Sequence, residues 1–255
     1  MKIEEILKIR NECIVGNFIP KTQFYEFGGL KSRDKAIFTD DIKKIHWCYS
    51  LREDNIRITP YKDKIRDYKE VEIIKVSLKK EVTMGKIERI ADIILRTIPY
   101  PSVLIFEREN KILLAVSHKQ EHKSDSTKTT LEDLILTSWI DLEDLDEIDE
   151  KLFESLNINN LSFSHFYKFY SEIVNNINIY NGSKLVKKDL SVSVKLSPDE
   201  IKAIQEEIVS KNNEIKLKRN LIKKETQFNK QVDINIEIKR IEKEIGELKS
   251  KLIEY

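Results

Sequence analysis

Glycine, cysteine and long apolar runs are all scarce in this chain of 255 residues. With only six glycines, it contains neither G-x-G-x-x-G nor G-x-x-x-x-G-K-[ST], which excludes nucleotide sites of the common loop types. Its two cysteines, Cys13 and Cys48, are too few for the disulfide framework of a small secreted protein and predict a reduced, cytoplasmic location. No apolar stretch approaches about eighteen residues, so we expect no membrane span.

An excess of either charge is also missing, because 45 basic residues oppose 44 acidic ones. No global field attracts nucleic acid or anionic lipid, and any such binding must be local. His118 and His122 are four residues apart but have no cysteine nearby, so they make a poor zinc site. We therefore expect neither a metal nor a cofactor.

Periodicity predicts an α+β domain with a mixed, mostly antiparallel sheet and flanking helices over residues 1–185. Two features are the clearest: a strand at Val71–Leu78, rich in β-branched residues, and a helix at Met84–Ile98 that ends at Pro99. The other expected elements are a short helix that includes Ile3, Ile6 and Leu7 and ends before Gly16, a loop at 19–30, a helix from Thr39 or Asp40 through Tyr49, a strand at 55–58, a hairpin at 102–119 turning at Glu109 and Asn110, a polar run at 120–130, a strand at 134–140, and helices near Leu152 and at 164–180, the last ended by Asn181–Lys184.

After an expected linker at 186–196, residues 197–255 carry heptad repeats. Ser197, Pro198 and Glu200 form a helix start signal. The isoleucines before residue 222 and those after residue 234 follow different heptad phases, which predicts a break between about 225 and 233 and hence an antiparallel helical hairpin, a short coiled coil.

The seam of this hairpin is the predicted partner-binding surface. Lys211 and Lys218 interrupt it, and we expect the remaining apolar surface to contact a protein partner or a second copy. The alternative is that the seam packs only on itself or on the globular domain. The seam residues assigned to partner binding are Ile201, Ile208, Ile215, Phe228, Ile238, Ile245 and Leu252.

A metal-dependent nuclease needs carboxylates for Mg²⁺ and a lysine for the attacked phosphate on neighbouring strands. The nearest arrangement is Glu72 and Lys75 with Asp54. Residues three apart on a strand point to opposite faces, so the interpretation of Glu72 and Lys75 as ordinary ionic residues of the sheet is favoured.

Basic and aromatic side chains also gather near the N-terminus, a mixture that can hold phosphates and stack bases. The alternative is a helix with a solvated basic face and its aromatic side chains in the core, and this alternative is favoured. The candidate nucleic-acid-binding residues are Lys21, Tyr25, Arg33, Lys43, Lys44, Trp47 and Arg52.

Several short motifs resemble the domain of unknown function 4391 family of bacterial proteins. The residues that carry the resemblance are Ile19-Pro20-Lys21, Phe24-Tyr25, Phe38, Ile45, Trp47, Tyr49, Leu51, Asn55-Ile56, Glu72-Ile73, Val76, Leu78, Ile98-Pro99-Tyr100-Pro101, Lys119, Thr137-Ser138-Trp139, Glu225, Gln227-Phe228-Asn229, Val232 and Ile234-Asn235. None of these motifs is a catalytic signature.

The resemblance implies a cytoplasmic accessory protein encoded beside DNA helicases and DNA methyltransferases in restriction-like or phage-defence gene sets. We therefore expect a partner-binding or DNA-contacting subunit whose partner is such a helicase or methyltransferase. The alternatives are a divergent metal-dependent nuclease and a self-assembling structural protein whose hairpins pair between chains.

Overall fold

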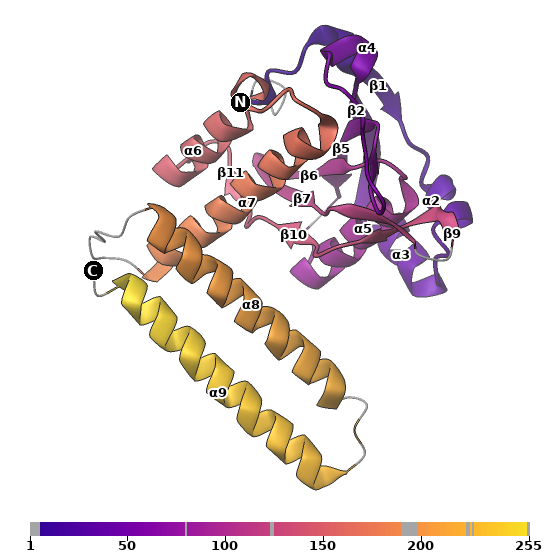
Figure 1. The fold of residues 1–255 in the computed structure, drawn as a ribbon. Coiled ribbons are helices and arrows are strands. Elements are labelled where there is room, and N and C mark those ends of the chain that lie inside the picture. Colours follow the sequence, from indigo (N-terminus) through magenta and orange to yellow (C-terminus); the bar gives the residue numbers. More distant parts are fainter. Residues whose placement is uncertain are drawn as a thin grey trace. The chain divides into compact units, whose positions relative to one another are not determined.

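The computed structural model describes residues 6–79, 81–122, 125–189, 198–222, 225 and 227–253. The chain divides into two compact units, Met1–Asn181 and Gly182–Tyr255 (Figure 1). The first unit contains the sheet and the second contains a pair of long helices.

The sheet of the first unit has the strand order β1-β2-β5-β6-β7-β10, and β11 also pairs with β7. Neighbouring strands are antiparallel except β5 and β6, which are parallel and are connected through helix α5 (Met84–Thr97). This confirms the mixed, mostly antiparallel α+β fold. The strands are β1 (Ile14–Phe18), β2 (Ile42–Arg52), β5 (Glu70–Leu78), β6 (Ser102–Arg108), β7 (Lys111–Val116), β10 (Ile135–Leu136) and β11 (Ile140–Asp141).

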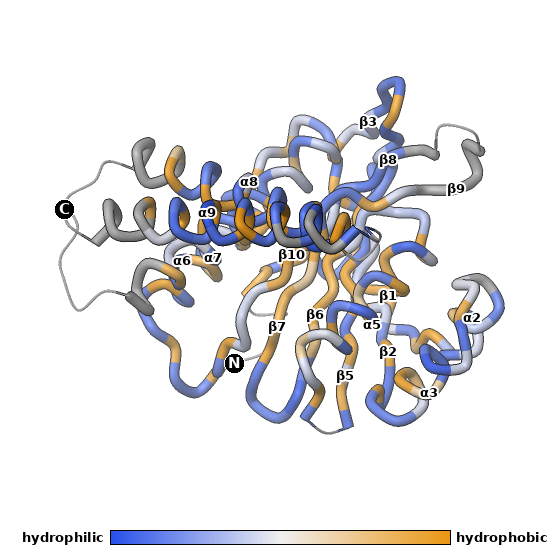
Figure 2. Tube along the Cα trace, turned by 90° about the horizontal axis from the view of Figure 1, so that it is seen from below, coloured by the Kyte–Doolittle hydropathy of each residue, from blue (hydrophilic) through white to orange (hydrophobic). Residues whose placement is uncertain are grey.

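Each face of the sheet has its own apolar core. On one face Ile74 and Leu104 pack with Ile90 of α5, and helices α2 (Lys21–Phe27) and α3 (Ser32–Asp41) contribute to the same cluster. The other face packs against α6 (Glu147–Leu156), the 3-10 helix η2 (Ile158–Asn160) and α7 (Phe166–Asp189). Figure 2 shows the apolar character of strands β5, β6 and β7.

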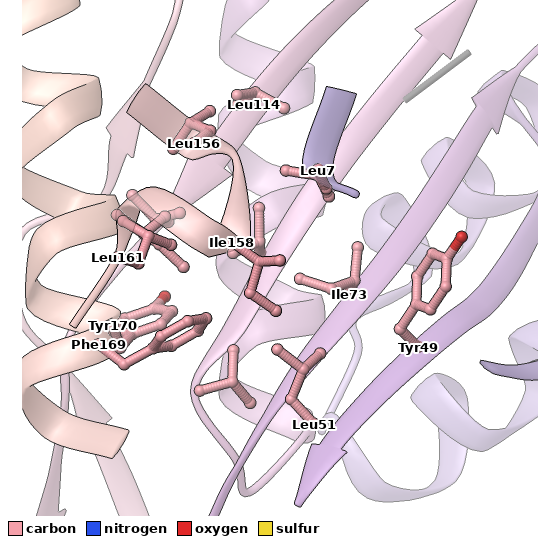
Figure 3. Packing of buried hydrophobic residues seen from close by; sticks show 14 of the residues in the cluster. Leu7, Tyr49, Leu51, Ile73, Leu114, Leu156, Ile158, Leu161, Phe169 and Tyr170 are labelled. Carbon is pink, nitrogen blue, oxygen red and sulfur yellow. The ribbon is translucent and has the colours of Figure 1, made fainter. Parts of the chain in front are cut away.

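In this second core, Leu51 and Ile73 of the sheet lie with Ile158 and Phe169 (Figure 3). A cavity of about 20 Å³ remains between them, with a wholly apolar lining. This is the space of about one water molecule, so it is a packing gap and not a ligand pocket.

The helix expected from Thr39 or Asp40 to Tyr49 is wrong, because helix α3 ends at Asp41 and the residues from Ile42 on form strand β2. Two irregularities in its pairing with β5, at Ile42/Lys44 and Trp47/Tyr49, explain the error. Each bulge adds one residue and shifts the alternation of the side chains. Ile42 and Ile45 therefore share one face although they are three apart, a spacing that imitates a helix.

Four further expectations also fail. The loop at 19–30 contains α2, the strand at 55–58 is helix α4 (Glu53–Ile56), and the polar run at 120–130 forms strands β8 (Lys119–His122) and β9 (Asp125–Leu131). Asn181–Lys184 does not end α7, which continues to Asp189. A Cβ at Gly182 would lie 2.5 Å from the Gln205 side chain, so glycine permits close packing there instead of ending a helix.

The strand at 71–78, helix α5, the β6–β7 hairpin and the two helices before residue 180 are confirmed. Glu109 has the left-handed φ of 53° that a tight hairpin turn requires. The strand expected at 134–140 is only the two short strands β10 and β11. The first helix, expected to end before Gly16, is described only from Ile6: Ile6 and Leu7 are helical, and strand β1 begins at Ile14. The short strands β3 (Tyr61–Lys62) and β4 (Asp67–Tyr68) pair with each other.

The second unit confirms the helical hairpin. Helices α8 (Pro198–Ile222) and α9 (Phe228–Ile253) contain 25 and 26 residues and are separated at the predicted phase break. Lys211 pairs with Glu244 and Lys218 with Glu237, so residue numbers rise on one arm as they fall on the other, which makes the arms antiparallel. In the part of the chain that the structure describes, no helix has the length and apolar character needed to cross a membrane.

Candidate functional site

Glu72 lies on the α5 face of strand β5 and is only 1% exposed. Two donors on β2 hold its carboxylate: Trp47 Nε1 donates to Oε2 at 2.5 Å and Ser50 Oγ donates to Oε1 at 3.2 Å. Ser50 reaches it because it is the cross-strand partner of Glu72. A carboxylate that accepts two hydrogen bonds in the core is a structural anchor between the two strands.

Burial raises the pKa of the Glu72 carboxyl from 4.5 to about 7, whereas the hydrogen bond from Trp47 opposes this rise. The charge of Arg52 also opposes the rise, and the carboxylate in turn acts on the buried Lys119, which is 3% exposed. Burial lowers the pKa of the Lys119 ammonium to about 7, and the charge of Glu72 opposes this. Nζ of Lys119 donates to the carbonyls of Leu95 and Ile98, so it binds the C-terminal end of α5.

The residues of the nuclease hypothesis are not brought together. Lys75 faces away from Glu72: it pairs across the sheet with His46 and its Nζ lies 3.8 Å from Oε1 of Glu107. Asp54 is on the exposed helix α4 and pairs with Arg52 at 3.4 Å. Among the described residues, no group of three or more His, Cys, Asp or Glu side chains is placed to hold a metal ion.

Three of the seven candidate nucleic-acid-binding residues are engaged in local structure. Nζ of Lys21 donates to the carbonyl of Ile42, and burial lowers the pKa of this ammonium. The hydroxyl of Tyr25 lies 3.2 Å from that of Thr39, and its ring meets the edge of Phe38. Together with Trp47, they tie α2, α3 and β2 to one another.

The other four candidates, Arg33, Lys43, Lys44 and Arg52, are exposed. Arg33 lies on α3, and the others lie on β2. Nζ of Lys44 lies 5.5 Å from the ring centre of Phe18, and this ring is 5.0 Å from that of His46. We call Phe18, Lys44, His46 and Lys75 the open sheet face.

Sequence reasoning missed Phe18 and His46 as candidate site residues. Phe18 is 64% exposed on the edge strand β1, and its distance in sequence from Lys44 hides their contact. The sequence around Phe18 offers only an isolated aromatic residue. Its exposure is visible only in the structure, where most residues of β1 are exposed and the strand shows no alternation of buried and exposed side chains. The pairing of Phe18 with His46 comes from the strand register, which no single-sequence periodicity specifies.

The ring of His118 is held by hydrogen bonding at the edge of the core. Its Nδ1 lies 2.9 Å from the hydroxyl of Tyr68, and burial lowers the pKa of its ring. The hydroxyl of Tyr170 donates to the carbonyl of Ser102 at 2.8 Å and accepts from the amide of Ser117 at 3.3 Å. These hydroxyls join α7 and β4 to the ends of the central strands.

On the hairpin, the seam residues predicted to bind a partner are buried between the arms. Ile208, Ile215, Ile238 and Ile245 are between 5% and 8% exposed, and the side chains of Ile201, Phe228 and Leu252 lie outside the described residues. Lys211 and Lys218 do not leave gaps, because their ammonium groups lie 2.8 and 2.7 Å from glutamates of α9. A closed hairpin therefore satisfies its own seam.

Apolar side chains remain on the outside of the hairpin. Val209, Leu217 and Leu221 on α8 are 53%, 65% and 55% exposed, and Ile236 on α9 is 61% exposed. The three on α8 are separated by eight and four residues, which places them along one side of the helix. We call Val209, Leu217 and Leu221 the outer row.

The family model described as "Domain of unknown function (DUF4391)" matches residues 7–245, nearly the whole chain. No curated protein and no solved structure matches.

Proposed function

Because the chain belongs to the DUF4391 family, we propose that it is an accessory subunit of a bacterial DNA-modification or phage-defence assembly. In this proposal the hairpin holds a protein partner, namely the helicase or methyltransferase encoded beside it, and the α+β unit is a platform that contacts DNA. The resemblance in the sequence motifs supplies the kind of partner, and the hairpin supplies the means of binding it.

The observation that carries the proposal is the outer row. Its three side chains are more than half exposed on a helix whose other side is already packed and ion-paired. Because Lys218 and Arg219 pair with Glu237 and Glu242 at 2.7 and 2.9 Å, the hairpin presents these side chains without first having to fold on its partner. A preordered apolar strip of this kind suits a groove on another protein.

This location differs from the seam assigned from the heptads. A partner of the seam would have to separate the two arms and expose isoleucines that are at most 8% exposed. A protein that binds the outer row can contact the closed hairpin without separating its two arms. The outer row is therefore the favoured binding surface.

Binding to the purified neighbouring helicase or methyltransferase tests the proposal, with full-length protein immobilised. We expect the double variant Leu217→Glu, Leu221→Glu to bind at least about tenfold more weakly, as central interface residues do. Ile236→Glu, an equally exposed apolar position on the other arm, is the matched control.

Failure of the wild-type protein to bind either enzyme contradicts the proposal. Concentration-dependent light scattering of the same proteins examines the self-assembly alternative. Dimers that the double variant abolishes would replace the enzyme partner by a second copy.

A further inference from the structure

The sheet face opposite α5 is covered over only part of its width. Residues paired across strands share a face, and one such row runs from β1 to β7 as Phe18, His46, Lys75, Ile105 and Leu114. Ile105 and Leu114 are 0% and 2% exposed in the core with α7, whereas Phe18 is 64% exposed. The row therefore changes from core to surface between β6 and β1.

The neighbouring row brings cations to the exposed half. Lys44 pairs across the sheet with Ser77, whose hydroxyl donates to Glu107 at 3.1 Å. Glu107 is also the acid 3.8 Å from Lys75. Lys44 itself is exposed, and no carboxylate in the described part of the chain pairs with it.

We propose that the open sheet face binds single-stranded nucleic acid, with a base stacked on Phe18 beside His46 and a backbone phosphate held by Lys44. The inference deepens the DNA contact of the proposed function and rests on it. Its geometry depends only on β1, β2 and β5, so it involves no residue of the hairpin.

The combination of an aromatic ring and a lysine on the open sheet face favours nucleic acid over a protein or peptide ligand. An apolar protein surface placed on Phe18 would remove water from Lys44 without giving it a partner, which is costly. An acidic peptide would pair with Lys44 but would leave Phe18 without a flat ring to stack on. A nucleic-acid strand supplies both a π surface and a negative charge in each residue.

The strand must be single, because the bases of a duplex are stacked on one another inside it and cannot stack on a side-chain ring. Side chains on neighbouring strands are separated by about 5 Å, which allows the ring of Phe18 and the ammonium of Lys44 to reach a base and its adjoining phosphate. The Lys44 ammonium lies over the Phe18 ring, 5.5 Å from its centre, and so starts within reach of a phosphate that adjoins a base stacked there.

Fluorescence anisotropy of full-length protein with labelled oligothymidine of about 20 nucleotides tests the inference. Phe18→Ala is expected to weaken binding about tenfold, through loss of one base–aromatic stack. Lys44→Ala is expected to reduce the slope of log K against log salt by about 0.7, the value for one phosphate contact on a single strand.

Two control variants remove a lysine and an apolar side chain that lie outside the open sheet face. Lys64→Ala removes an exposed lysine between β3 and β4, and Ile65→Ala removes an apolar side chain that is 39% exposed. Both variants should bind like the wild type. Duplex DNA of equal length should compete weakly.

Three outcomes overturn the inference: no binding by the wild-type protein at low salt, equal binding of duplex and single strand, or unchanged binding by both Phe18→Ala and Lys44→Ala. The hairpin variants separate this result from the wider proposal. Leu217→Glu, Leu221→Glu should bind oligothymidine normally, and Phe18→Ala should still bind the protein partner.

Discussion

Replacing Glu72 by glutamine should reveal how strongly the fold opposes its ionisation. The pKa of this carboxyl rises from 4.5 to about 7 through burial. A tenfold change in a protonation constant equals about 1.4 kcal/mol, so the ionised form destabilises the folded state by at most about 3.5 kcal/mol. Glutamine carries no charge but keeps one oxygen that can accept from Trp47 Nε1, and its amide can donate to the hydroxyl of Ser50, which can act as an acceptor.

The direction of the pH dependence of stability follows from the pH at which the folded and unfolded states each release the proton of Glu72. The unfolded chain releases it near pH 4.5 and the folded protein near pH 7. The unfolded state therefore binds fewer protons between these values, and the stability of the wild-type protein falls as pH rises through this window. The burial of Lys119 is common to both proteins and cancels in the comparison, whereas its attraction to the ionised Glu72 is lost in the variant and works against the expected difference.

We expect Glu72→Gln to have nearly the wild-type free energy of unfolding at about pH 4 and to exceed it by up to about 3 kcal/mol at about pH 8. Urea unfolding followed by tryptophan fluorescence is the assay, because Trp47 and Trp139, the only tryptophans, both lie in the first unit. Glu88→Gln, at an exposed position of α5, should show no such divergence. A stability difference for Glu72→Gln that does not change with pH would refute the reasoning and show that the carboxylate is ionised in contact with water or a cation.

Three further predictions concern the stability of variants with one substitution each. Gly28→Ala would place a Cβ 2.5 Å from the carbonyl oxygen of Phe24, so we expect a loss of roughly 1–3 kcal/mol in urea unfolding; Gly85→Ala, with nothing within 4 Å, should instead gain about 0.5 kcal/mol. Asp34 accepts two hydrogen bonds from Arg89 at 2.8 and 2.9 Å, which lower the pKa of its carboxyl. Asp34→Asn should therefore cost about 1 kcal/mol at neutral pH and progressively less as pH falls through the lowered pKa, and a pH-independent cost would argue against the ion pair. Ile215→Ala should destabilise the hairpin by about 2–5 kcal/mol and lower its melting temperature in far-ultraviolet circular dichroism, whereas the unfolding transition of the first unit, followed by tryptophan fluorescence, should not change. An equal effect of Leu217→Ala would contradict the assignment of the seam.

The elements that the sequence predicts well are those whose signals are local. The heptad phases of residues 197–255 specify two arms and the break between them, because each seam position repeats within its own helix. Helix α5 and the β6–β7 hairpin are likewise defined by neighbouring residues, namely Pro99 and the turn at Glu109. The opposite orientations of Glu72 and Lys75 follow from strand alternation alone, and this alternation by itself weighs against the nuclease hypothesis.

Other features depend on contacts between residues distant in the sequence. Two bulges set the faces of β2, and they exist because of its pairing with β5. Burial of Glu72 and the meeting of Phe18, His46 and Lys75 depend on the register of three strands. The sequence by itself determined the class of fold, the helical hairpin and the types of residue near the N-terminus. The tertiary structure decided which of those residues reach the surface together, because cross-strand register and burial arise from pairings that no local periodicity encodes.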